Sequence, residues 1–163
     1  MNEKLKAVKS AMAAAFMALG TFLGWKGIML LAWVGVMGLD YLSGSAAACK
    51  EGKWSSAVAR TGLWHKGGMI IVVAVAAIAD GVLGIICGQT PIGLEWPGVI
   101  LPLVLAWYIL TELGSILENA MKLGVRVPKW LTQFMSAVRH LVDDAADKVT
   151  DVGDTAADLP DIE

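Results

Sequence analysis

Three carboxylic acids lie inside stretches that are otherwise apolar. Their presence there has to be explained, because an ionisable side chain is unfavourable in an apolar environment. Asp40 and Asp80 are the only charged residues in positions 27–49 and 67–88, and Glu112 lies inside a third apolar run. None of the three runs contains a lysine, arginine or histidine, so we expect the acids to have no cationic partner. A carboxylate at the depth of a bilayer costs roughly 2.5–3.5 kcal/mol. Each acid should therefore face another helix or water and avoid lipid.

Small and polar residues share helical faces with these acids. Two interpretations stay open: the acids join helices within one chain by hydrogen bonds to serine, threonine or asparagine, or they line a polar face that meets water in a pore. Four short spans enclose little interior, so these faces favour contacts with other copies. The predicted polar assembly seam consists of Asp40, Gly44, Asp80, Gly84, Glu112, Ser115, Glu118 and Asn119.

The residues that commonly carry catalysis or bind metals are few and scattered. Cys49 and Cys87 fall at opposite ends of apolar runs, and His65 and His140 are far apart in sequence. No spacing among them matches a metal site, a nucleophile with its base or a phosphate-binding loop. We predict no catalytic, cofactor-binding or metal-binding residue, and we predict that the protein is not an enzyme.

Composition indicates an all-α integral membrane protein. The chain has 163 residues, 56% hydrophobic and 17% charged, with a mean hydropathy of +0.63, whereas a soluble domain carries about 25% charge. A spanning helix needs about 20 apolar residues. Four runs approach or reach that length, so we predict spans at about 7–25, 27–49, 67–88 and 96–118, with the first two as a tight hairpin. The first run lacks the small-residue cleavage site of a secretory signal.

The basic residues orient these spans. With four spans and the N-terminus inside, the inner segments hold 12 of the 13 lysines and arginines, and the outer turns hold only Lys26. The positive-inside rule then places both termini in the cytoplasm. A three-span alternative lays the first run on the surface and leaves the N-terminus outside.

The last 36 residues divide into two parts. Residues 128–142 place large apolar side chains on one helical face, which suits a helix on the inner membrane surface or one packed on its neighbours in an oligomer. Residues 143–163 hold eight acidic residues, one lysine and no aromatic residue. We expect this tail to be disordered in the cytoplasm.

Three blocks of sequence resemble a phage holin family that includes the clostridial toxin-secretion holins and holins of phages of Gram-positive bacteria. The blocks are LDYLSG at 39–44, the basic segment and apolar run at 55–80, and ELGSILENAMKLGVRVPKWL at 112–131. The third block, similar to the family pattern E-x-x-S-I-x-E-N followed by glycine and proline, is the most specific. The acidic tail departs from the short basic tail of many holins.

The resemblance implies a role that the residues alone do not establish. A holin accumulates in the inner membrane and then oligomerises into lesions that release an endolysin or activate an exported one, causing lysis of the host cell. It implies no cofactor and no nucleic acid, with the lipid bilayer and further copies of the chain as partners and the endolysin as a functional partner without required contact. The alternatives are an antiholin, a small ion or solute transporter, or a membrane anchor that recruits a partner through its acidic tail.

Overall fold

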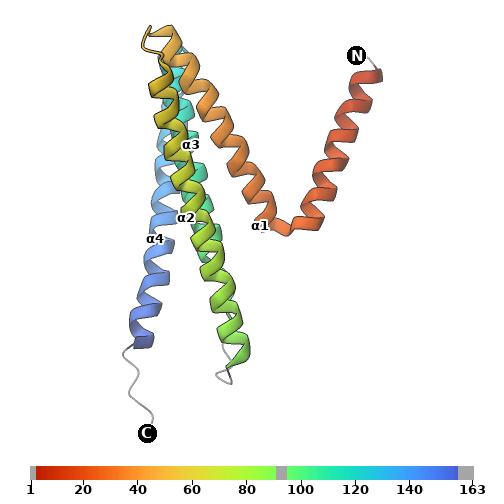
Figure 1. Ribbon diagram of the computed structural model, residues 1–163, viewed down its shortest axis with the longest axis vertical. Coiled ribbons are helices and arrows are strands. Elements are labelled where there is room, and N and C mark those ends of the chain that lie inside the picture. Colours follow the sequence, from red (N-terminus) through yellow and green to blue (C-terminus); the bar gives the residue numbers. More distant parts are fainter. Residues whose placement is uncertain (1–2, 91–94, 158–163) are drawn as a thin grey trace.

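The described part of the chain consists of helices joined by short turns. The computed structural model describes the backbone of residues 3–90 and 95–157, and this part contains no strand (Figure 1). Its helices are α1 (Glu3–Lys50), α2 (Ser56–Gln89), α3 (Ile100–Lys122) and α4 (Lys129–Ala157). Residues 1–2, 91–94 and 158–163 lie outside the described part.

Helix α1 consists of two limbs joined at a sharp bend. Gly24 has φ 65° and ψ −177°, a conformation that only glycine adopts without strain. The backbone reverses there, and the limb before Gly24 diverges from the rest of the molecule in Figure 1. The predicted tight hairpin between the spans 7–25 and 27–49 is thus an open bend, and it lies at Gly24, next to the predicted boundary of the two spans.

Among the residues that the structure describes, three helical segments are long and apolar enough to cross a membrane, namely Gly24–Lys50, Ser56–Gln89 and Ile100–Lys122. They correspond to the predicted second, third and fourth spans. The predicted span 7–25 falls on the first limb of α1, which is not among them, so the count of four spans is not confirmed. The three candidate helices support a membrane location.

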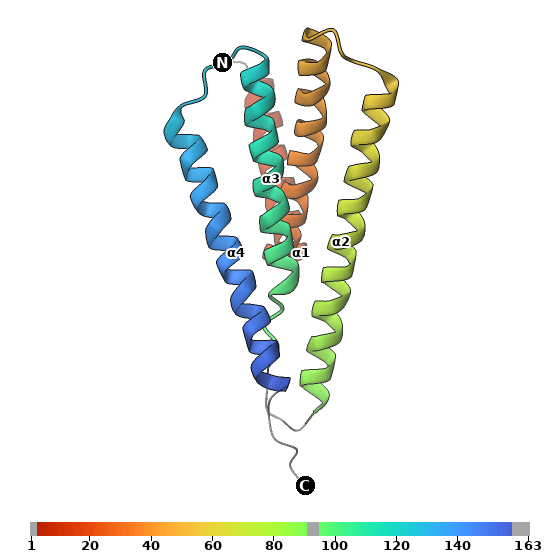
Figure 2. The same cartoon turned by 90° about the vertical axis from the view of Figure 1, so that its left-hand side faces the viewer.

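Helix α3 is the centre of the packing. It contacts each of the other three helices, whereas α1 and α2 contact each other far less (Figure 2). Leu105 of α3 is fully buried, and Trp33 of α1 stacks on Tyr108 of α3 at 6.1 Å between ring centroids. The buried apolar core comprises Trp33, Met37, Met69, Val73, Ala76, Leu101 and Leu105. Following the predicted orientation, we call the end of the bundle at the α1–α2 turn the inner end and the end at the start of α3 the outer end. The apolar core lies toward the outer half, and the inner half contains the polar residues.

The inner end is closed by lysine contacts. Lys50 Nζ donates to the carbonyl oxygens of Leu123 at 2.7 Å and Lys122 at 3.3 Å, which suits the negative end of α3. In the turn between α1 and α2, Lys53 Nζ donates to Glu51 Oε2 at 3.0 Å, and this hydrogen bond lowers the pKa of the Glu51 carboxyl group.

Helix α2 begins eleven residues before its predicted span. Ser55 caps its N-terminus, and the hydroxyl of Ser55 accepts a hydrogen bond from Val58 N at 3.2 Å. The residues expected to form a basic loop up to Lys66 are therefore the first turns of a 34-residue helix. At 1.5 Å per residue α2 is about 51 Å long, and it exceeds a hydrocarbon core of about 30 Å.

The predicted disorder of residues 143–163 is not confirmed for the part that the structure describes. Helix α4 continues past Val142 to Ala157, while residues 158–163 lie outside the description. Only part of the predicted apolar face of 128–142 is covered: Leu131, Val138 and Val142 are half-buried, whereas Trp130, Phe134 and Leu141 are 58–66% exposed. Small side chains explain the longer helix, because Ala145, Ala146 and Val149 extend the covered face beyond Val142.

Candidate functional site

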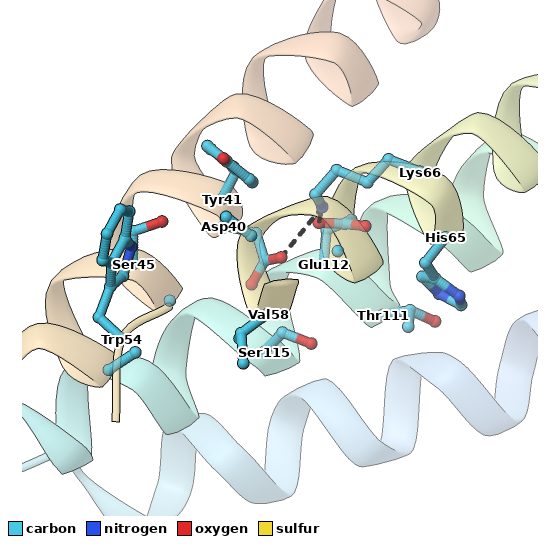
Figure 3. Close-up of a pocket in the computed structure, with 14 residues that line it drawn as sticks. Asp40, Tyr41, Ser45, Trp54, Val58, His65, Lys66, Thr111, Glu112 and Ser115 are labelled. Atoms are coloured by element: carbon cyan, nitrogen blue, oxygen red, sulfur yellow. Dashed lines mark hydrogen bonds and ion pairs between the residues drawn. The ribbon is translucent and has the colours of Figure 1, made fainter. Parts of the chain in front are cut away.

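Asp40 and Glu112 meet around a lysine that sequence reasoning had excluded as a partner. Lys66 Nζ lies 3.0 Å from Asp40 Oδ2 and 2.5 Å from Glu112 Oε2 (Figure 3). The expectation that these acids have no cationic partner is therefore wrong. Its error was to treat Lys66 as a loop residue, when Lys66 lies inside α2 and its side chain is 13% exposed.

Asparagine completes this group. Asn119 Nδ2 donates to Asp40 Oδ1 and to Ser43 Oγ, both at 3.2 Å. Asn119 also packs on Gly44, where an added Cβ would lie 3.4 Å from Nδ2. We call Asp40, Ser43, Lys66, Glu112 and Asn119 the inner cluster.

The three charged residues of the inner cluster lie at the same depth because each is the same number of residues from the inner end of its helix. Asp40 is ten residues before Lys50, Glu112 is ten before Lys122, and Lys66 is ten after Ser56. Ten helical residues correspond to about 15 Å. The cluster therefore lies well inside the bundle, where its charges are largely removed from bulk water and depend on one another.

A cavity of about 260 Å³ opens beside the inner cluster. Asp40, Lys66 and Glu112 line it together with His65 and Thr111, as the close-up in Figure 3 shows. Ser115, a predicted seam residue, lies on the same wall. The space is polar on one side and could admit water without disturbing the ion pairs.

Asp80 belongs to a separate group at the other end of the bundle. Its carboxylate accepts hydrogen bonds from Trp96 Nε1 at 2.9 Å and from the backbone N–H groups of Ile100 and Leu101, both at 3.0 Å. These N–H groups belong to the first turn of α3, where a helix favours negative charge. Asp80 thus joins α2 to the N-terminus of α3.

Lys26 supplies the positive charge of this outer junction. Lys26 Nζ lies 3.8 Å from Asp80 Oδ2 and donates to Gly98 O at 2.8 Å. Gly98 has φ +67°, which favours glycine, and an added Cβ would lie 2.3 Å from Lys26 Nζ, so any other residue would strain the backbone and displace the lysine. We call Lys26, Asp80, Trp96, Gly98 and the first turn of α3 the outer junction.

The predicted seam is thus divided by position. The structure brings Asp40, Gly44, Glu112 and Asn119 together inside the protomer, with Ser115 at the cavity and Asp80 at the outer junction. Gly84 and Glu118 are exposed on the outside of α2 and α3. A Cβ built on Gly84 would meet no atom within 4 Å.

Sequence reasoning missed Lys66, Lys26 and the indole of Trp96. A detectable signal existed for Lys66: with Met69, Val73, Ala76 and Asp80 it falls on one helical face, and the last four of these residues are buried. A stripe of residues spaced four apart, namely Ala76, Asp80, Gly84 and Gly88, shifts gradually off this face because a helix has 3.6 residues per turn. Among the described residues no group of three or more histidine, cysteine, aspartate or glutamate side chains could hold a metal ion.

Comparison with known proteins identifies relatives of this chain. An uncharacterised protein of Halalkalibacterium halodurans is 35% identical over 101 residues, which cover 62% of this chain and 70% of that protein. An uncharacterised protein of Clostridium perfringens strain 13 is 31% identical over 63% of this chain and 68% of its own. An uncharacterised 14.9 kDa protein of C. perfringens is 30% identical over 127 residues, which cover 76% of this chain and 89% of that protein.

The family match covers the three candidate membrane-spanning segments of the described chain. The sequence profile described as the bacteriophage holin family matches residues 17–140. No solved structure matches the chain. The matched part contains both the inner cluster and the outer junction, together with the first turns of α4. The chain therefore belongs to the bacteriophage holin family.

Proposed function

We propose that the protein is a holin that accumulates in the host's inner membrane, oligomerises and forms lesions, with both termini in the cytoplasm. The lesions would release an endolysin or activate an exported one and so lyse the cell. The observation that carries this proposal is the family match over residues 17–140, because it includes the three helical segments of the described chain that are long and apolar enough to span a bilayer.

The inner cluster suits the first stage of this role, in which copies are stored without damage. Lys66 balances two acids inside one protomer, so a single copy can hold these charges at depth without another copy. The outer junction does the same for Asp80. Storage of separate protomers is thus compatible with the buried charges.

Assembly then needs surfaces on the outside of the protomer. Within the predicted seam, we assign contacts between copies to the exposed positions Gly84 and Glu118. Gly84 allows close approach of a neighbouring helix because nothing occupies the space where its side chain would be. The buried members of the seam would act by holding α1, α2 and α3 in register.

Induced expression in a bacterial host tests the proposal. We expect abrupt loss of membrane potential and, when an endolysin is co-produced, lysis. Accumulation in the membrane without loss of viability, with delay of lysis by a second holin, would instead identify an antiholin. Ion or solute flux at low protein density without cell death would identify a transporter.

A further inference from the structure

The face of α2 opposite its buried residues changes in character along the helix. Ile71 and Ile85, both 66% exposed, belong to its aliphatic part. Toward the inner end the same face continues from Ile71 through Gly67 and Trp64 to Arg60, at spacings of four, three and four residues. In Figure 2, α2 lies at one edge of the bundle, and its inner end follows the α1–α2 turn. This face is therefore aliphatic, then aromatic, then cationic toward the inner end.

A hollow of about 400 Å³ lies at the cationic end of this face. Arg60, Leu63, Trp64 and Gly67 line it. Gly67 keeps it open, because a Cβ built there would meet no atom within 4 Å, and Trp64 is 81% exposed. Arg60 is exposed as well and makes no ion pair or side-chain hydrogen bond with the described residues. The hollow thus combines apolar walls with a cation that is available to an anion from outside the protomer.

The depth of the hollow matches the headgroup layer of a membrane. Residues 67–88 carry a single charge, that of the buried Asp80, and their 22 helical positions span about 33 Å, close to a hydrocarbon core of about 30 Å. Trp64 lies about 5 Å and Arg60 about 10 Å inward of Gly67. The polar layer on each side of the core is about 5–7 Å thick. Trp64 therefore lies within this layer, where tryptophan is favoured, and the long side chain of Arg60 reaches it from its edge.

We propose that this hollow binds an anionic phospholipid of the inner leaflet. The guanidinium group of Arg60 donates two N–H groups to the lipid phosphate, Trp64 lies against the glycerol region, and an acyl chain follows α2 from Gly67 to Ile71. Charge complementarity selects this occupant, since the cytoplasmic leaflet is negatively charged and attracts cations next to a membrane span. The inference rests on the proposed function for the orientation that places the inner end of α2 in the cytoplasm.

Lipid retention by the purified whole chain tests the site. In detergent, native mass spectrometry measures the binding of phosphatidylglycerol during a titration, with phosphatidylcholine as the zwitterionic comparison. We expect the parent to bind one phosphatidylglycerol in preference to phosphatidylcholine, and Arg60→Gln to weaken this binding by about fivefold, the effect of one cation near an anionic surface. Arg126→Gln is the matched control, because Arg126 is exposed in the α3–α4 turn and does not line the hollow. Equal binding by the two variants, or no preference of the parent for phosphatidylglycerol, would overturn the proposal.

Filling the hollow gives an independent measurement. Gly67→Leu places a side chain in it and should weaken phosphatidylglycerol binding without lowering accumulation in the membrane. Gly81→Leu is the control, because Gly81 is equally open at its Cβ position but does not line the hollow. Unchanged lipid binding in Gly67→Leu, together with loss of cross-linked oligomers, would overturn the proposal because a second copy would then occupy the hollow. Displacement of the lipid by an equal concentration of inorganic phosphate would also overturn it, since the site would then recognise phosphate alone.

These binding measurements do not depend on lysis, so the two proposals can fail separately. A parent protein that binds phosphatidylglycerol through Arg60 but never lyses its host would remove the holin function and leave the lipid site standing. A parent that lyses its host while Arg60→Gln retains the lipid would overturn the lipid site alone.

Discussion

Lys66 is the residue on which the inner cluster depends most. It is the one cation within 4 Å of Asp40 and Glu112 among the described residues, and its side chain is 13% exposed. Replacing it by an apolar residue would leave the buried Glu112 and the half-buried Asp40 without a counter-charge. Removal of one partner from a buried pair costs about 3–5 kcal/mol.

We expect Lys66→Met to lower stability by several kcal/mol on that basis, about 3–5, and to reduce accumulation in the membrane. Thermal unfolding in detergent measures the first effect and immunoblotting of membranes the second. Lys53→Met is the matched control, because Lys53 pairs with Glu51 at the surface and is 77% exposed. Exposed pairs contribute about 0–1 kcal/mol, so this variant should match the parent. Equal behaviour of the two variants would show that the inner cluster does not hold the helices together.

Substitutions of Asp80 should act differently from those of Lys66, because the partners of Asp80 are mainly N–H groups. Asp80→Asn keeps one acceptor oxygen, whereas Asp80→Leu leaves two backbone N–H groups and the Trp96 indole N–H without their acceptor. An unsatisfied buried donor costs about 1–3 kcal/mol. We expect the leucine variant to lose clearly more stability than the asparagine variant, with the first turn of α3 exposed to hydrogen exchange. Equal protection of Ile100 and Leu101 in both variants would contradict the capping role.

At the scale of the elements, the bend in α1 depends on one glycine. Gly24→Ala introduces a Cβ at φ 65° and ψ −177°, a conformation that costs about 1–3 kcal/mol outside glycine. We expect the two limbs to straighten, which would lengthen the distance between spin labels at Ser10→Cys and Lys53→Cys. Gly35→Ala is the control, because Gly35 is helical and has open space at its Cβ position. An unchanged distance distribution in Gly24→Ala would show that the bend is imposed by packing.

Two lysines connect the elements at opposite ends of the bundle. Lys50 closes the inner end by binding the carbonyl groups that end α3, and Lys26 closes the outer end through Gly98 and Asp80. Both lysines come from α1, which explains why α1 and α3 form the most extensive helix pair. Helix α2 is held on α3 by Lys66, by Asp80 and by its apolar stripe, whereas α4 is held by its covered stripe and by the contact of Arg139 with Trp107.

At the scale of the whole molecule, topology is the property that the charges predict most directly. In a variant without native cysteines, Gln89→Cys should react with an impermeant reagent added outside intact cells, and Lys53→Cys should react only after the membrane is opened. Ser10→Cys decides between the two predicted topologies: protection supports four spans, and reaction from outside supports three. Reaction of Lys53→Cys in intact cells would contradict the inward orientation of the basic segments.

The sequence by itself determined the class of the molecule. Apolar runs of spanning length, a one-sided distribution of cations and the block 112–131 were sufficient for a helical membrane protein of the holin family, because length and hydropathy are local properties of a chain. The same reading identified Asp40, Asp80 and Glu112 as the residues that require partners.

Only the tertiary structure decided which partners they have. Lys66 and Lys26 lie at the edges of the apolar runs, and their reach depends on where α2 starts, how α1 bends and how three helices are aligned in depth. Helix α4 was missed beyond Val142 for a related reason. Beyond Val142 the covered residues of α4 are alanines and valine separated by aspartates, which is a weak helical pattern in sequence. This segment is stabilised as a helix because it packs on the surface of α3.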